Sequence, residues 1–93
     1  AIFINTARGP LMNEADLTEK LEKNESFGAG LDVYEFEPRV NEGLTKLKNA
    51  VLVPHIGSAT YKARLGMASM TVNSVKQALS GQIPDHLIPE LKK

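Results

Sequence analysis

The chain has 93 residues, of which 42% are hydrophobic, and its eleven basic side chains balance eleven acidic ones. This balance argues against nucleic acid and against an anionic membrane surface as partners. The absence of Cys excludes disulfides, a thiolate nucleophile and a Cys-based metal site, and it fits a cytoplasmic protein. No apolar run approaches the roughly 20 residues of a membrane span. The length allows one domain at most, and we expect no metal site.

The first predicted element is a strand at residues 1–5, an apolar run that suits burial on both faces, as in a parallel sheet. Because the sequence starts inside this strand, we expect it to be a piece of a longer protein; the alternative is a processed chain. Gly9 and Pro10 end the element, so Arg8 lies on a loop just past the strand. A loop Arg is usually only solvated, but a planar guanidinium at this position also suits a carboxylate ligand.

A helix is predicted from Asn13 onward, because Asn is a good N-cap and acidic residues in the first turn favour the positive end of the helix dipole. Its buried side is expected to hold the apolar residues Leu11, Ala15, Leu17 and Leu21. Glu14 and Thr18 are expected on the solvent side with the other polar residues.

The second predicted strand covers residues 27–33. Its two glycines cost stability inside a strand and therefore indicate the close approach of another backbone, a helix or a flat ligand. Asp32 lies near the carboxyl end of this strand and needs a partner or solvent; we favour a ligand-facing position over an ordinary surface one. In the loop that follows, Glu35 and Glu37 supply two carboxylates, of which one is expected to point at a site.

The third predicted strand covers residues 49–54, after a polar connection with one helical turn around 44–47. His55 follows directly, then a turn of small residues and a long helix over 59–80, with Gly81 as its stop. An imidazole at this junction suits proton transfer near neutral pH, although a capping loop with an incidental His is the simpler alternative. The helix carries a stripe of small residues and Met, which predicts core or interface packing.

The order of strands and helices predicts an α/β fold, a parallel sheet of three strands with flanking helices. Parallel strands end at one shared edge of the sheet, and ligands bind beyond that edge. Arg8, the pair Asp32 and Glu37, and His55 each follow a different strand. Three loops that are distant in sequence are therefore expected to bring a cation, acids and a base together.

Three motifs make this expectation specific: Asn5-Thr-Ala-Arg-Gly9, Gly28-Ala-Gly-Leu-Asp-Val-Tyr-Glu-Phe-Glu-Pro38 and Pro54-His-Ile-Gly-Ser-Ala-Thr60. In this order they resemble the late signatures of the D-isomer-specific 2-hydroxyacid dehydrogenases, over about residues 1–83. The last motif is most similar to the glyoxylate/hydroxypyruvate reductase branch, with the phosphoglycerate dehydrogenases as close relatives. Glu37 argues against the formate dehydrogenases, which carry Gln there, and the small residues after His55 argue against the corepressor members.

The resemblance implies a Rossmann-like domain whose enzyme moves a hydride between NADH or NADPH and a small 2-keto acid such as glyoxylate or hydroxypyruvate. It implies that His55 is the general acid and that Glu37 pairs with it and favours its protonated form. Arg8 is implied to polarise the keto group and hold the substrate carboxylate, and Asp32 to contact the nicotinamide. The other implied cofactor contacts come from the loops after the first and third strands: Thr6, Ala7, Arg8, His55, Ile56, Gly57 and Ser58.

No Gly-x-Gly-x-x-Gly phosphate loop occurs in the sequence. We therefore expect residues 1–81 to be the C-terminal portion of the NAD(P)-binding domain and residues 82–93 to be an arm returning toward a substrate domain. The longer enzyme is expected to be a homodimer, and the 93 residues alone are expected to be inactive. The alternative is a truncated, non-catalytic binding module that retains the fold; the intact Arg8, Glu37 and His55 count against it.

Overall fold

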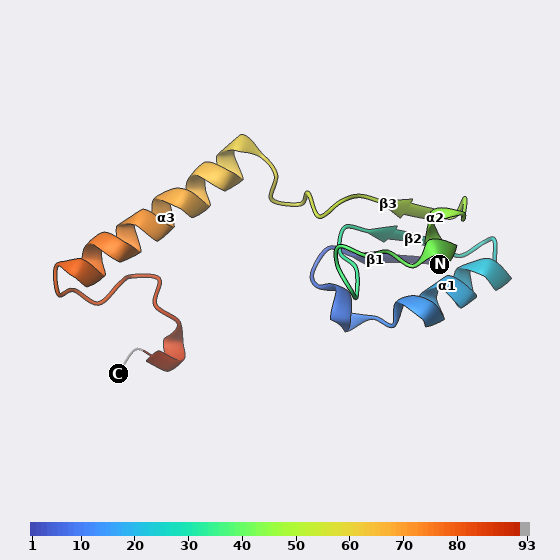
Figure 1. The fold of residues 1–93 in the computed structure, drawn as a ribbon, viewed down its shortest axis with the longest axis horizontal. Coiled ribbons are helices and arrows are strands. Elements are labelled where there is room, and N and C mark those ends of the chain that lie inside the picture. The colour runs from blue at the N-terminus through green and yellow to red at the C-terminus, as the bar shows by residue number, and fades with distance from the viewer. Residues whose placement is uncertain (92–93) are drawn as a thin grey trace. The chain divides into compact units, whose positions relative to one another are not determined.

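The computed structural model describes residues 1–91, and the chain divides into two compact units, of which the first is Ala1–Gly57 and the second begins at Ser58. The first unit holds the sheet and two short helices, and the second holds one long helix (Figure 1). Within residues 1–91 the α-helices are α1 (Glu14–Lys23), α2 (Glu42–Thr45) and α3 (Tyr61–Leu79), and short 3-10 helices cover Gly9–Leu11 and Pro89–Leu91.

Three parallel strands form the sheet of the first unit, in the order β1–β2–β3. They are β1 (Ile2–Asn5), β2 (Gly28–Leu31) and β3 (Ala50–Leu52). Ile4 is paired with Gly30, and Gly30 in turn with Val51, so all three strands run in step toward one shared carboxyl edge. This arrangement confirms the predicted α/β sheet.

The core of the first unit lies on one face of this sheet. Leu21 of α1 and Leu44 of α2, each 1% exposed, pack with Ala29 and Leu31 of β2. Asn49, just before β3, links the sheet to α1 by a hydrogen bond, because its side-chain amide donates to the carbonyl of Leu21 at 3.0 Å. Helices α1 and α2 therefore pack against one face of the sheet, the face on which Ala29 and Leu31 of β2 lie.

The opposite face of the sheet is exposed, which differs from the predicted burial on both faces. Ile2, Ile4 and Val51 are 78%, 63% and 66% exposed, because the helices of the unit cover only the other face.

The glycines of β2 were expected to admit a backbone, a helix or a flat ligand. A Cβ on Gly30 would instead lie 2.9 Å from Cδ1 of Ile4, so this glycine makes room for a side chain of the neighbouring strand.

Helix α1 begins as predicted, because the side chain of Asn13 accepts a backbone N–H bond in the first turn at 3.0 Å. Its buried side was predicted correctly for Leu21 and Leu17, which are in or against the core, and wrongly for the other residues. Leu11 and Ala15 are exposed, whereas Glu14 and Thr18 are 3% and 6% exposed. The hydroxyl of Thr18 is satisfied internally, since it donates to the carbonyl of Glu14 at 2.7 Å. The loop after β2 meets this side of the helix, and helical periodicity alone does not reveal such a neighbour.

Helix α3 dominates the second unit. Thr60 caps it by accepting a backbone N–H bond at 3.0 Å, and Gly81, with φ of 83°, provides the predicted stop. None of its residues is buried in the described part of the chain. The stripe was predicted to pack in a core or in an interface, and within these residues it is not part of a core: Met67, Met70 and Val75 are 50%, 46% and 52% exposed. The interface stays a prediction.

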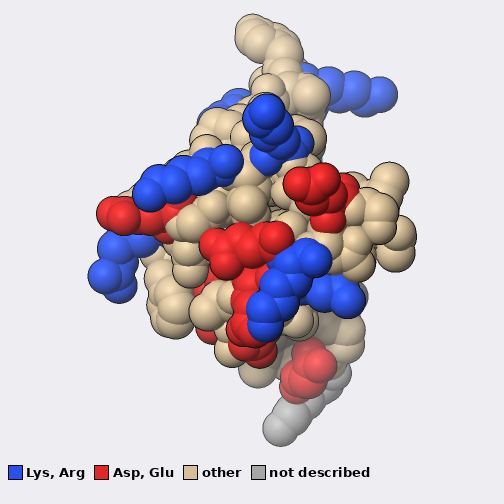
Figure 2. All heavy atoms as spheres, turned by 90° about the vertical axis from the view of Figure 1, so that its right-hand side faces the viewer, with Lys and Arg blue, Asp and Glu red and all other residues tan. Residues whose placement is uncertain are grey.

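The surface carries charges of both signs. Figure 2 shows Lys and Arg interspersed with Asp and Glu over the face that it draws, in keeping with a net charge of zero. Among residues 1–91, no helix has the length and apolarity needed to cross a membrane. The same residues form no group of three or more His, Cys, Asp or Glu that could hold a metal ion.

Candidate active site

Glu37 and His55 meet at the carboxyl edge of the sheet. Nδ1 of His55 lies 2.9 Å from Oε2 of Glu37, and both side chains are partly exposed. The other carboxylate oxygen of Glu37 accepts the backbone N–H of Tyr34 at 3.1 Å. Glu37 is thus fixed from two sides. With Nδ1 engaged, Nε2 is the nitrogen of His55 that can face another molecule.

These hydrogen bonds lower the pKa of Glu37 below its ordinary value of 4.5. The largest cause is the bond with His55, the next is the N–H of Tyr34, and the positive charge of Arg8 adds a smaller part. Each stabilises the charged form of the carboxyl group. Glu37 is therefore ionised at neutral pH and remains an acceptor for the imidazole.

The backbone of His55 is in the left-handed region, with φ of 55°, which residues with a side chain rarely adopt. Asp32, 5% exposed, stabilises the turn that follows: Oδ1 accepts the N–H of Ile56 at 2.7 Å, and Oδ2 accepts that of Gly57 at 2.8 Å. The partner that this buried acid requires is thus the chain's own backbone rather than a ligand, which differs from our expectation. Its implied contact with nicotinamide stays a prediction.

Tyr34 is a residue of this site that the sequence did not reveal. It is 6% exposed. Its hydroxyl donates to the carbonyl of Val53 at 2.7 Å and, over a longer distance of 3.2 Å, to the carbonyl of Leu31. The carbonyl of Val53 also accepts the N–H of His55 at 3.1 Å. Tyr34 therefore joins the ends of β2 and β3 next to the imidazole. The only available signal was an aromatic residue with a polar tip directly after a buried strand.

Arg8 lies on the loop after β1, as predicted, and its exposed guanidinium donates to the carbonyl of Ala7 at 2.7 Å. Asn5, which was not among the predicted site residues, shapes this loop. Its side chain accepts the N–H of Ala7 at 3.1 Å and donates to the carbonyl of Arg8 at 3.0 Å. An Asn at a strand end is a known turn former, and that was the available signal.

The structure distinguishes the two carboxylates of the loop after β2. Glu37 reaches His55, whereas Glu35 turns to the start of α1, where Oε1 accepts the N–H of Glu14 at 3.0 Å. The alternative that the sequence left open is thereby decided geometrically in favour of Glu37. The remaining implied cofactor contacts stay predictions: Thr6, Ala7, Ile56, Gly57 and Ser58, the last of which opens the second unit.

Comparisons with known proteins agree with this geometry. The family model described as "D-isomer specific 2-hydroxyacid dehydrogenase, NAD binding domain" matches residues 1–57. The chain therefore belongs to the D-isomer-specific 2-hydroxyacid dehydrogenase family, and its sheet is part of a Rossmann-like domain. The description of this family model names NAD as the dinucleotide that such a domain binds.

Individual relatives are similar over nearly the whole chain. A protein of Staphylococcus haemolyticus that is assigned as a 2-hydroxyacid dehydrogenase is 47% identical over 88 residues, which are 95% of this chain and 28% of the relative. A glyoxylate reductase from Paecilomyes thermophila is 39% identical with a TM-score of 0.86, covering 98% of this chain and 28% of that one. An NADPH-dependent glyoxylate/hydroxypyruvate reductase from Sinorhizobium meliloti, solved with NADP and malonate, is 38% identical with a TM-score of 0.81, covering 86% of this chain and 25% of that one. The chain thus spans 28% of the length of the curated relatives it matches.

The residues present fit the nicotinamide end of such a cofactor. The exposed guanidinium of Arg8 and the exposed imidazole of His55 lie on loops at the edge where dinucleotide-binding sheets receive their ligand. The phosphate loop that would hold the pyrophosphate is absent from the sequence. The fit therefore extends to that one end of the dinucleotide.

Proposed function

We propose that this chain supplies the proton donor and the substrate clamp of an NAD(P)-dependent reductase of small 2-keto acids such as glyoxylate or hydroxypyruvate. The observation that carries the proposal is the 2.9 Å contact between His55 and Glu37 at the shared edge of the sheet. The reductases among the similar structures, which are named for these two substrates, support the substrate class.

Each residue has a separate task in this chemistry. Bound NADH or NADPH supplies the hydride that reduces the keto carbon. His55 donates a proton from Nε2 to the keto oxygen, while Glu37 keeps the ring oriented through Nδ1 and stabilises its positive charge. Arg8 pairs with the substrate carboxylate and polarises the keto group, tasks that suit a planar guanidinium. Asp32 contributes by fixing the turn from which the imidazole projects.

A chimaera tests this proposal. In it, the chain replaces the matching segment of the Staphylococcus haemolyticus relative, so that a complete cofactor site is present. We expect it to reduce glyoxylate or hydroxypyruvate with NADH or NADPH, and His55→Ala to lower kcat by about 10²–10⁴-fold. His86→Ala, an exposed His outside the site, is the matched control and should retain activity. A loss below about tenfold in His55→Ala would contradict the role assigned to His55. A folded chimaera without any reductase activity would favour the non-catalytic binding module instead.

The 93 residues by themselves are proposed to be inactive, because nothing in the sequence provides the phosphate loop. Reduction of glyoxylate by the isolated chain with NADH or NADPH would refute this. We propose further that the longer enzyme is a cytoplasmic homodimer. The exposed apolar residues of α3, among them Met67 and Val72, support an interface, and sedimentation equilibrium of the chimaera measures it.

A further inference from the structure

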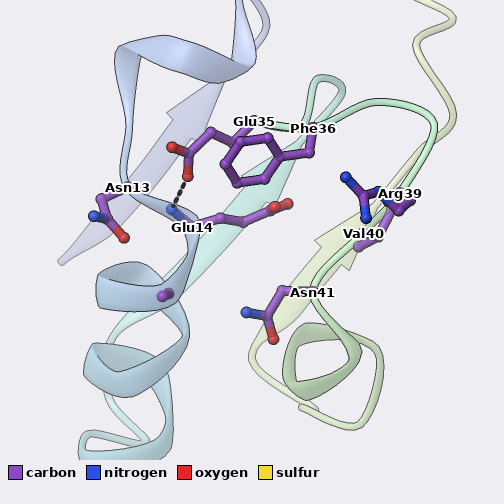
Figure 3. A pocket seen from close by; sticks show the side chains of 8 residues that line it. Asn13, Glu14, Glu35, Phe36, Arg39, Val40 and Asn41 are labelled. Carbon is purple, nitrogen blue, oxygen red and sulfur yellow. Dashed lines mark hydrogen bonds between the residues drawn. The ribbon is translucent and has the colours of Figure 1, made fainter.

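A hollow in the first unit, separate from the candidate active site, lies between the start of α1 and the loop after β2 (Figure 3). It has a volume of about 510 Å³, within the range of small-ligand sites. Arg8, Glu37 and His55 do not line it. The lining residues that matter for its chemistry are Glu14, Glu35, Phe36, Arg39, Val40 and Asn41.

Glu14 presents an unpaired carboxylate oxygen to this hollow. The residue is 3% exposed, and Oε1 is buried without a hydrogen-bond partner. Figure 3 shows its carboxylate extending away from α1, below the ring of Phe36 and toward Arg39. Burial and the nearby charge of Glu35 raise the pKa of Glu14, and the backbone N–H of Asn41 offsets this only in part. A buried carboxylate oxygen without a partner is unfavourable even where the other oxygen has one, so Oε1 requires a donor.

The other side of the hollow presents donors. Figure 3 shows the guanidinium of Arg39 facing the end of the Glu14 side chain. Within the described chain, this guanidinium makes no side-chain hydrogen bond or ion pair. The amide of Asn41 uses its oxygen to accept the N–H of Gly43 at 2.9 Å, which leaves its NH₂ group available. One unpaired acceptor, Oε1 of Glu14, and the unpaired donors of Arg39 and Asn41 therefore belong to residues that line the same hollow.

We propose that this hollow binds a small zwitterion, a free α-amino acid with an aliphatic side chain, with its ammonium group on Glu14 and its carboxylate on Arg39. A simple cation would also face Arg39, and a simple anion would also face Glu14, whereas a zwitterion is complementary to both. Phe36 and Val40 offer apolar surface to a short side chain. The described residues offer no set of three ligands for a metal ion. The proposal is independent of the proposed reductase function.

The test is a titration of the full 93-residue chain, followed by two-dimensional ¹H–¹⁵N NMR, with three probes of matched size. L-alanine carries both charges, ethylamine only the positive one and propionate only the negative one. We expect saturable shifts with L-alanine at the amides of the lining residues, and binding of each half-ligand at least about tenfold weaker. Absence of saturation with L-alanine, as when Arg39 pairs internally with Glu14, overturns the proposal. Equal binding of either half-ligand overturns it too.

Two variants locate the site. Arg39→Gln removes an exposed guanidinium and should weaken L-alanine about tenfold or more without affecting ethylamine. Glu14→Gln should weaken L-alanine similarly. Because Glu14 is buried, Arg39→Gln alone decides the matter if Glu14→Gln does not fold. Arg64→Gln, an exposed Arg on α3, is the control. Unchanged binding of L-alanine in Arg39→Gln overturns the proposal.

Discussion

The hydroxyl of Tyr34 donates a 2.7 Å hydrogen bond to the carbonyl of Val53, 19 residues further along the chain. That carbonyl also accepts the backbone N–H of His55, so the phenol fixes the segment from which the imidazole projects. Burial, followed by the charge of Asp32, raises the pKa of Tyr34 above 10.0. The hydroxyl therefore remains a donor at every pH at which the site would work.

Tyr34→Phe should loosen this segment while leaving the ring packing intact. We expect a loss of about 0.5–1.5 kcal/mol in the free energy of unfolding, the usual net value of one hydrogen bond. We also expect the pKa of Glu37 to move up toward 4.5, because its bond to His55 becomes less well populated. Urea denaturation and ¹³C NMR of the Glu37 carboxyl measure the two effects. Tyr61 is 89% exposed on α3, and Tyr61→Phe is therefore the control. Equal results for the two variants would show that the hydroxyl of Tyr34 does not hold the segment of His55.

Asp32→Asn should damage the turn after His55 more severely. The carboxylate accepts the N–H groups of both Ile56 and Gly57, whereas an amide can accept one and turns its own NH₂ toward the other. We expect a loss of about 1.5–3 kcal/mol, as for hydrogen bonds to a charged group, and faster hydrogen exchange at these two amides. Asp16→Asn, an exposed acid in the first turn of α1, should cost only about 0.3–1 kcal/mol. Unchanged hydrogen exchange at the amides of Ile56 and Gly57 would show that Asp32 does not stabilise this turn in solution.

His55→Ala provides a pH test of the Glu37 pair. The folded-state pKa of Glu37 lies below 4.5, so its contribution to stability is present above pH 4.5 and is lost as the pH falls through the lowered pKa. Removing the imidazole removes the largest cause of the shift, and the carboxyl should then titrate closer to 4.5. The stability difference between wild type and variant should narrow as the pH falls through this window. His86→Ala should leave the titration of Glu37 in place, and an unmoved Glu37 in His55→Ala would disprove the pairing in solution.

Much of this site was predictable because short patterns encode it. Strand ends followed by His55 and by the loop of Glu35 and Glu37, together with the parallel order of the strands, predicted that an acid and a base meet at one edge. The choice of Glu37 as the partner of His55 came from the family resemblance, and the structure shows this contact. The cap at Asn13 and the stop at Gly81 are likewise local signals.

The features that escaped prediction depend on contacts between distant segments. Asp32 is an acid in an apolar strand, and its partners are backbone N–H groups 24 and 25 residues away, which carry no sequence signature. Glu14 and Thr18 are polar and were therefore assigned to the solvent side of α1. They are buried because the loop after β2 reaches that side of the helix, and this depends on the path of the chain rather than on the helix itself.

The same added methyl group should have opposite effects at Gly9 and at Gly66. A Cβ on Gly9 would lie 1.9 Å from the carbonyl oxygen of Tyr34 and 2.0 Å from its carbonyl carbon. Backbone atoms cannot rotate away as a side chain would, so Gly9→Ala must displace the segment that leads to Glu37. We expect a loss of about 3 kcal/mol in the free energy of unfolding, the upper end of the usual cost of overpacking, together with a rise in the pKa of Glu37 as its bond with His55 is disturbed.

Gly66 lies inside α3, and a Cβ there meets nothing within 4 Å. Alanine at this position gains helix propensity, about 0.5–1 kcal/mol relative to glycine, so Gly66→Ala should raise the helicity of α3 in circular dichroism and leave the Glu37 titration unchanged. Comparing Gly9→Ala with Gly66→Ala separates the general effect of replacing a glycine from the effect of the close contact between Gly9 and the backbone of Tyr34. If Gly9→Ala unfolds at the same urea concentration as wild type, then the loop after β1 does not lie against Tyr34 in solution, and the site must be held together in another way.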